Sequence, residues 1–164
     1  MDIVFKEGQS VFNYRVAAVW LHEDHILLHR DVNAKDWSLP GGRVAFGEES
    51  IDSLKREMKE ELNVVVNVER LLFVNENFFP FQNHQFHEIG FYYLVSLNNN
   101  HLFQQGPFYG EEGERLIYQW VPLSRIENIT LYPEKLKSLL NKLPDNVEHI
   151  VTRQSDFHSS IPRS

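Results

Sequence analysis

The alternation of hydrophobic and polar positions predicts a chain made mostly of strands, with one helix near the middle and one near the end. Residues 14–30 contain two apolar stretches, YRVAAVWLH and HILLHR, which the polar EDH turn joins as a pair of strands. Two long segments rich in β-branched and aromatic residues, 64–79 and 87–97, predict further strands, and so does 115–123. Residues 133–143 begin with proline and predict a closing helix. This order of elements is typical of the α+β class with a mixed sheet.

Residues 49–62 have helical periodicity and sort their charges onto separate sides. One apolar stripe runs along the segment, formed by Ile51, Leu54, Met58 and Leu62. At about 100° per residue, three carboxylates fall on one flank, those of Glu57, Glu60 and Glu61, while both lysines fall on the other. Like charges three and four residues apart repel, so an exposed helix gains more from mixed signs. Two interpretations remain open: a solvated helix surface, or an acidic flank that binds a hard cation such as Mg²⁺.

The loop before this helix supports the cation interpretation. Gly41 and Gly42 follow a proline, and their missing Cβ atoms let backbone carbonyl groups come close to an ion or a phosphate. Glu48 lies where the loop meets the helix, placed either to act on the metal or to hold the loop. Arg56 lies one helical turn before Glu60 and can orient its carboxylate. A loop that leads into a helix, with carboxylates on both, suits metal-dependent phosphate chemistry.

Composition narrows the class of protein. The chain has 164 residues, of which 42% are hydrophobic, and this suits one globular domain. Its formal net charge of −7 disfavours a general DNA- or RNA-binding surface, although a bound metal ion would still allow a nucleotide substrate. The absence of cysteine excludes thiol nucleophiles, disulfides and zinc–thiolate sites. The first residues lack a signal-peptide pattern, and the longest apolar run, VAAVWL, is too short to span a membrane. We therefore expect a cytoplasmic protein.

The residues from Gly42 to Val64 resemble the Nudix box, the signature of the MutT-like Nudix hydrolase family. That signature reads Gly, five residues, Glu, seven residues, Arg-Glu, an apolar residue, any residue, Glu-Glu, any residue, Gly and an apolar residue. Here the segment reads GRVAFGEESIDSLKREMKEELNV, and eight of the nine specified positions match. The exception is Asn63, which replaces the usual glycine. Asparagine is the next best residue for a left-handed helix end, so we expect the same geometry with a small loss of stability.

The resemblance implies both a fold and a division of the chain. The fold would be an α/β/α sandwich in which the box helix packs across a mixed β-sheet. We expect a single domain over residues 1–164, with a core at about 10–143 and a C-terminal tail at 144–164.

The family's chemistry implies roles for the box residues. Nudix hydrolases cleave a phosphoanhydride bond in a nucleoside diphosphate linked to another group, using Mg²⁺ or Mn²⁺ and an activated water. By position, the resemblance assigns metal binding to Glu57, Glu60, Glu61, Gly42 and, in an assisting role, Glu48. Arg56 would orient the carboxylates. The alternative is a non-catalytic nucleotide-binding or regulatory Nudix domain, which is expected to have lost box carboxylates that this chain keeps.

The general base has two candidate positions. Some family members use a box glutamate, which corresponds to Glu60, and others use a glutamate in the loop before the last strand. That loop offers Glu111, Glu112 and Glu114, and the position of Glu114 is similar to that in MutT-type members. The predicted catalytic residues are therefore Glu60, Arg56 and Glu114. For each loop glutamate, a solvated surface acid is the alternative.

Substrate contacts are expected outside the box. Phe79 is a candidate for stacking on a nucleotide base; the alternative is that it packs in the core of a strand. His84 is a candidate for contacting phosphate; the alternative is a histidine without a functional role. Arg30 follows an apolar strand, where related enzymes place a basic residue near the substrate; a surface arginine is the alternative. The expected partner is a small nucleotide, not DNA or a membrane, and a homodimer is left open.

Overall fold

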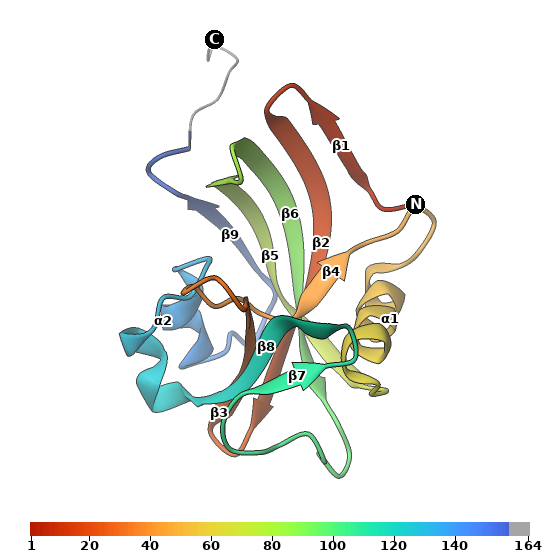
Figure 1. Cartoon of the computed structure of the whole chain (residues 1–164), viewed down its shortest axis with the longest axis vertical. Coiled ribbons are helices and arrows are strands. Elements are labelled where there is room, and N and C mark those ends of the chain that lie inside the picture. The colour runs from red at the N-terminus through yellow and green to blue at the C-terminus, as the bar shows by residue number, and fades with distance from the viewer. Residues whose placement is uncertain (158–164) are drawn as a thin grey trace.

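The computed structural model describes residues 1–157, which form a strand-rich chain with few helices (Figure 1). The strands are β1 (Val4–Glu7), β2 (Ser10–His22), β3 (His25–Asp31), β4 (Gly41–Arg43), β5 (Asn67–Phe81), β6 (His84–Ser96), β7 (Phe108–Gly110), β8 (Gly113–Pro122) and β9 (Glu148–Arg153). The helices are α1 (Ser50–Leu62), the 3₁₀ helix η1 (Leu123–Asn128) and α2 (Leu136–Leu140). The mixed order of strands and helices predicted from the sequence is confirmed.

Strand β2 organises the sheet because it has neighbours along both edges. On one edge its residues 10–20 run parallel to residues 85–95 of β6. On the other edge it pairs with β1, β4 and β3, all antiparallel. The path through the sheet is β7-β8-β3-β2-β6-β5-β9, with β1 and β4 added beside β2. The middle of β2 thus holds β4, with Val16 opposite Gly42, and fixes the start of the box.

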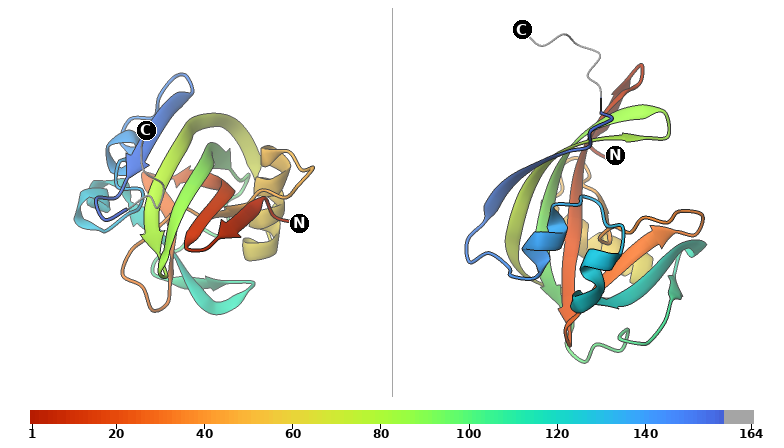
Figure 2. Two further views of the ribbon diagram at one scale, coloured as in Figure 1. Left: turned by 90° about the horizontal axis from the view of Figure 1, so that it is seen from above. Right: turned by 90° about the vertical axis from the view of Figure 1, so that its left-hand side faces the viewer.

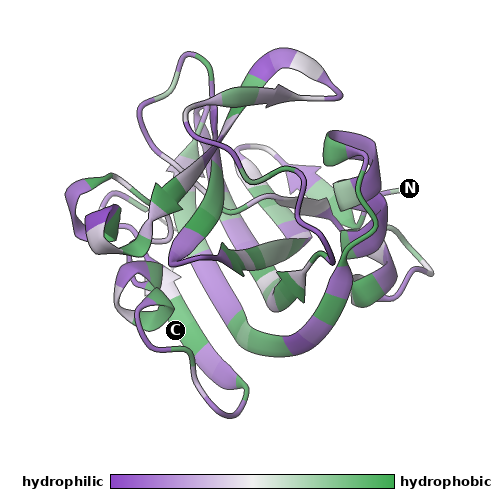
Figure 3. Ribbon diagram, turned by 90° about the horizontal axis from the view of Figure 1, so that it is seen from below, coloured by the Kyte–Doolittle hydropathy of each residue, from purple (hydrophilic) through white to green (hydrophobic). Residues whose placement is uncertain are grey.

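Two apolar clusters lie on opposite sides of the sheet. Figures 1 and 2 show α1 beside one face and α2 beside the other. Because side chains alternate along a strand, Val16 packs in the α1 cluster with Met58, whereas Ala17 packs in the α2 cluster with Leu136. Figure 3 shows this alternation of hydrophobic and hydrophilic positions along the strands. The result is the expected α/β/α sandwich with α1 packed against the mixed sheet.

The predicted box helix is confirmed, and its end has the expected geometry. Asn63 follows the last helical residue in the left-handed conformation, with φ 56° and ψ 40°, and its backbone N–H donates to the carbonyl of Lys59. The apolar stripe is shorter than predicted, because Ile51 is 38% exposed. Ser53 takes the inward position in that first turn, where its hydroxyl donates to Glu48.

The end of the chain differs from the expectation of a helix over 133–143 followed by a tail. Helix α2 is short, and residues 148–153 form β9, which pairs parallel to β5. Ile150 of β9 is buried against the α2 cluster, so this segment belongs to the packed domain. Residues 158–164 of the expected tail lie outside the described residues. Across residues 1–157, every helix is too short or too polar to cross a bilayer.

Candidate active site

The box begins where Gly42 of β4 lies against Glu57 of α1. A Cβ atom at position 42 would lie 2.5 Å from each carboxylate oxygen of Glu57, too close for any side chain. Glycine is therefore needed here to admit the carboxylate, whereas the sequence alone suggested room for a backbone carbonyl. The Glu57 side chain is 15% exposed, and its burial raises its pKa even though Arg56 opposes that shift.

Arg56 lies among three carboxylates. Its guanidinium nitrogens are 3.0 Å from Glu48, 2.9 Å from Glu57 and 3.3 Å from Glu60. The hydrogen bonds from Arg56 and then Ser53 hold the pKa of Glu48 down, at about 2. Charge-assisted bonds from a planar guanidinium restrict direction as well as distance. Arg56 thus holds two carboxylates of α1 in place and ties the preceding loop to the helix.

Glu61 is the most buried carboxylate of the acidic flank. The residue is 7% exposed, whereas the Glu60 side chain is 50% exposed. One oxygen of Glu61, Oε2, is buried without a hydrogen-bond partner among the described residues. Burial, and then the charge of Glu57, raise the pKa of Glu61 to about 8. A purely solvated acidic flank does not account for this residue.

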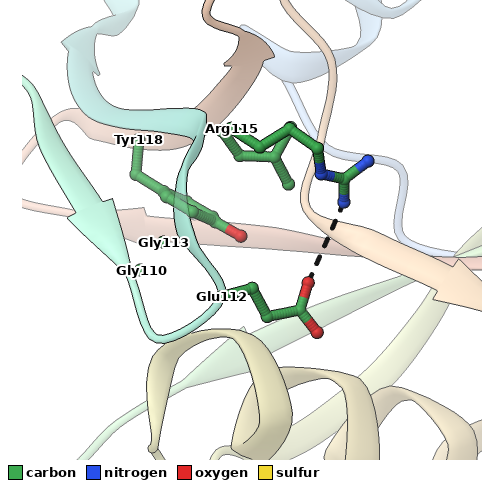
Figure 4. Close-up of a pocket in the computed structure, with 6 residues that line it drawn as sticks. Gly110, Glu112, Gly113, Arg115 and Tyr118 are labelled. Atoms are coloured by element: carbon green, nitrogen blue, oxygen red, sulfur yellow. Dashed lines mark ion pairs between the residues drawn. The ribbon is translucent and has the colours of Figure 1, made fainter.

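The turn between β7 and β8 docks against the end of α1. The backbone N–H of Glu111 donates to the carbonyl oxygen of Glu61 at 2.7 Å. A Cβ atom on Gly110 would lie 2.5 Å from the same carbonyl, so this turn needs glycine for close approach. Figure 4 shows the turn beside α1, with Tyr118 and Glu112 near the contact. The docking joins two segments that are about fifty residues apart in the chain.

The loop glutamates do not lie equally close to the box. The charge of Glu112 contributes to the raised pKa values of both Glu57 and Glu61. Glu112 also lies 3.9 Å from Arg115, with 48% of its side chain exposed (Figure 4). Glu114 lies within β8 and is exposed. Of the loop glutamates, Glu112 is the one whose charge acts on both of these box carboxylates, so it joins Glu114 as a candidate.

Sequence reasoning did not identify Tyr118 as part of this site. Tyr118 is 2% exposed, and it lowers the pKa of Glu61 slightly, against the larger effects of burial and of Glu57. The period-two pattern of the strand marks Tyr118 and Trp120 as inward-facing rings, and both pack in the α1 cluster. That pattern carries no signal that Tyr118 lies near Glu61.

Two of the three predicted substrate contacts, Phe79 and His84, lie away from the box. Arg30 donates to the backbone of the loop after β3 and lies over Trp37, 5.2 Å from the ring centroid. Phe79 stacks on Phe86 with centroids 5.1 Å apart, and His84 bonds the backbone of the β5–β6 turn. That turn lies near the start of β2, roughly 20 Å along the strand from the position opposite the box glycine.

The donor set at the box suits a hard divalent cation. Carboxylate oxygens are the ligands that Mg²⁺ and Mn²⁺ prefer. Glu57 and Glu61 are buried near each other, and a cation between them would relieve both the burial cost and the repulsion. Within residues 1–157, no three His, Asp or Glu side chains are already gathered in a metal-binding group. Arg56 draws Glu57 and Glu60 toward itself, so ligation by Glu60 requires it to turn away from the arginine.

Comparison with known proteins agrees with the box. Residues 12–143 match the family model described as the NUDIX domain. Over 67 residues the chain is 40% identical to human 8-oxo-dGDP phosphatase NUDT18, a match that covers 38% of this chain and 21% of that relative. The chain therefore corresponds to much less than two thirds of that relative's length.

Solved structures of low sequence identity share the fold. A MutT protein from Bacillus halodurans superposes with a TM-score of 0.63 at 16% identity. The superposition covers 89% of this chain and 93% of the MutT chain. An ADP-ribose pyrophosphatase from Streptococcus suis superposes with a TM-score of 0.57 at 19% identity, covering 85% and 98%. With a family model that spans most of its length, a box that matches at eight of nine positions and this fold, the chain belongs to the NUDIX domain family.

Proposed function

We propose that this protein is a metal-dependent pyrophosphohydrolase, which cleaves a phosphoanhydride bond in a nucleoside diphosphate linked to another group. The observation that carries the proposal is the buried, unpartnered Oε2 of Glu61 beside Glu57. An orphaned carboxylate oxygen in an acidic, low-dielectric place is costly unless a cation binds there. The family match and the human 8-oxo-dGDP phosphatase relative support the same class of reaction.

The box residues would divide the work between binding and orientation. Glu57, Glu60 and Glu61 would hold Mg²⁺ or Mn²⁺, which when bound neutralises a diphosphate and lowers the pKa of a bound water. Arg56 would keep Glu57 oriented while Glu60 turns toward the ion. Glu48 stays paired with the arginine and keeps the loop closed against α1.

Two carboxylates are candidates to accept the proton of the attacking water. Glu60 is half exposed at the rim of the acidic flank, and it would have to leave Arg56 to reach the water. Glu112 approaches from the β7–β8 turn, while Glu114 lies farther along β8. We propose Glu60 or Glu112 as the general base, because a base must lie within hydrogen-bond reach of the water it activates.

A non-catalytic nucleotide-binding domain is the second candidate. The observation in its favour is the position of Arg56, which pairs with Glu48, Glu57 and Glu60 and so partly offsets their charge. In that case nucleotides would bind without being cleaved.

A substrate screen separates the two candidates. Nucleoside triphosphates, 8-oxo-dGDP, dinucleoside polyphosphates, ADP-ribose and nucleotide sugars are incubated with the protein and Mg²⁺ or Mn²⁺, and released phosphate or nucleotide is measured. Cleavage should occur with the wild type, fall strongly in Glu60→Gln, and persist in Asp52→Asn, which neutralises an exposed acid on the same helix. Wild-type turnover by Glu60→Gln would contradict the role of the box, and binding without any cleavage would favour the second candidate.

A further inference from the structure

A row of polar side chains crosses four neighbouring strands on the face of the sheet that α2 packs against. Asn13 of β2 lies opposite Glu88 of β6, Glu88 opposite Asn77 of β5, and Asn77 opposite Thr152 of β9. Residues directly opposite one another project to the same face. Because β2 alternates without a break, Asn13 shares its face with Ala17 of the α2 cluster. Figures 1 and 2 show these four strands extending past α2.

The row is shielded from bulk water, yet its hydrogen bonds are incomplete. Asn13, Asn77 and Glu88 are 4%, 9% and 6% exposed. Thr152 donates to Asn77 at 2.7 Å, and Nδ2 of Asn13 donates to Oε2 of Glu88 at 2.9 Å. Oδ1 of Asn13 is buried without a partner, and Glu88 forms no ion pair within residues 1–157. Polar rows that only hold strands together are normally satisfied, so this one has acceptors to spare.

The unused groups of the row are hydrogen-bond acceptors that lie close together. A carboxylate only accepts, so Asn13 turns its NH₂ group toward Glu88 and leaves its carbonyl oxygen next to that contact. A carboxylate has room for about four hydrogen bonds, and Asn13 supplies one of them. A ligand that fits must therefore offer adjacent N–H donors. Among the nucleobases, guanine has this pattern at N1–H and its 2-amino group, whereas adenine has an acceptor at N1.

Two aromatic rings adjoin the polar row on the same face. Phe79 and Phe86 lie opposite each other, two residues from Asn77 and Glu88, and their ring centroids are 5.1 Å apart. Both side chains are partly exposed. Single bases are commonly recognised by stacking on aromatic rings together with hydrogen bonds to the base edge. The stacking role expected for Phe79 from the sequence therefore suits this part of the sheet.

The polar row lies within the reach of one nucleotide from the box. Asn13 is three residues from Val16, about 10 Å along the strand, and Val16 lies opposite Gly42. Between them Arg15 shares the face of Asn13. Burial, and then the charge of Glu57, raise the pKa of Glu61, and the charge of Arg15 opposes them, so Arg15 lies within electrostatic reach of the box. A ribose and its phosphate separate a base from the rest of a diphosphate by a comparable distance.

We propose that Glu88, Asn13 and Phe79 bind the base of the substrate and select guanine. The carboxylate of Glu88 and the free oxygen of Asn13 accept hydrogen bonds from N1–H and the 2-amino group, while Phe79 stacks on the ring. The inference rests on the proposed function, because it names the base of the nucleotide whose phosphoanhydride bond is cleaved. Strands outside the box thus choose the substrate that the box carboxylates act on.

The test is the binding of GMP, IMP and AMP, measured by isothermal titration calorimetry with Mg²⁺ present. These monophosphates contain no phosphoanhydride bond, so they bind without being cleaved. We expect GMP to bind about 10- to 100-fold more tightly than IMP, which lacks the 2-amino group and so loses a hydrogen bond to a buried charged acceptor. AMP should bind at least as weakly as IMP, because its N1 atom is an acceptor and faces the carboxylate.

Two variants remove the acceptors, and a third is the matched control. In Glu88→Gln, Asn13 donates to the new carbonyl oxygen, so the NH₂ group of the glutamine faces the donors of guanine. Asn13→Leu removes the second acceptor with little change in size. In both, the ratio of the Kd values for IMP and GMP should fall close to one. Glu76→Gln should keep the wild-type ratio, because Glu76 precedes Asn77 in β5, projects to the opposite face and pairs with His149 at 2.7 Å.

The possible results separate this inference from the proposed function. Absent or equal binding of the three monophosphates by the wild type would overturn the inference, even if no variant folds. A preference for GMP that survives in Glu88→Gln and Asn13→Leu would also overturn it, and so would an equal loss in Glu76→Gln. In each case, hydrolysis of nucleotides would leave the proposed function standing. A preference lost only in the Glu88 and Asn13 variants, in a protein that cleaves no nucleotide, would support the base site and overturn the proposed function.

Discussion

Replacing Glu61 by glutamine should stabilise the protein when no divalent metal is present. In the folded protein the pKa of this carboxyl is raised from 4.5 to about 8, chiefly by burial. Between these two pH values the folded state binds more protons than the unfolded state, so ionisation of Glu61 lowers stability as the pH rises. Glutamine keeps the shape of the side chain, but it cannot ionise.

The size of the effect follows from the pKa difference. At pH 7 the unfolded carboxyl is about 2.5 pH units above its ordinary pKa and is ionised, whereas the folded carboxyl still holds its proton. Each unit of this difference corresponds to ~1.4 kcal/mol. Glu61→Gln should therefore raise the free energy of unfolding by about 3 kcal/mol at pH 7. For a chain of this size that corresponds to a rise in Tm of roughly 6–12 °C. Below pH 4.5 the wild type and the variant should be equally stable.

The assay is thermal and urea unfolding from pH 4 to pH 9 with a chelator present. Glu134→Gln, which neutralises an exposed carboxylate, should follow the wild type at every pH. Adding Mn²⁺ should raise the Tm of the wild type and leave Glu61→Gln nearly unchanged. A difference between variant and wild type that does not grow with pH, or a less stable variant, would refute the reasoning about burial.

Three further changes test other parts of the site. Gly42→Ala should fold but bind Mn²⁺ more weakly, because the new Cβ displaces the Glu57 carboxylate; unchanged titration of Mn²⁺ would contradict that contact. Glu48→Gln should lower stability at pH 7 by at least about 1 kcal/mol and match the wild type near pH 2, since the pKa of Glu48 is lowered and its contribution is lost as the pH falls. Asn63→Gly should raise the free energy of unfolding by about 0.5–1 kcal/mol, because asparagine pays a steric cost in the left-handed conformation. An unchanged urea midpoint would argue that its side-chain bond with Lys59 offsets that cost.

Local patterns were enough to predict the box helix and its end. The apolar spacing of Leu54, Met58 and Leu62 and the αL preference of Asn63 are properties of a few neighbouring residues, so they can be read along the chain. The pairing of Arg56 with Glu60 follows from helix geometry in the same way.

Features that depend on distant segments could not be predicted in this way. Glu61 is buried because the β7–β8 turn and Tyr118 cover it from about fifty residues away. Strand β9 exists because β5 offers it an edge, and its own sequence of mixed polarity gives little strand signal. Which loop glutamate acts on the box depends on how the turn docks against α1: the charge of Glu112 raises the pKa of both Glu57 and Glu61.

Strands β1, β4 and β3 pair with successive parts of β2, and this arrangement determines where residues can be inserted without moving the box. The segment between β3 and β4 is anchored at both ends, since β3 pairs with β8 and β4 pairs with β2. His29 and Ser38 exchange two backbone hydrogen bonds that close its base. Residues inserted between 32 and 36 would therefore lengthen an exposed loop while Gly42 keeps its place against the helix. Loop length and composition can thus be varied, by selection or by design, independently of the box and the helix that follows it.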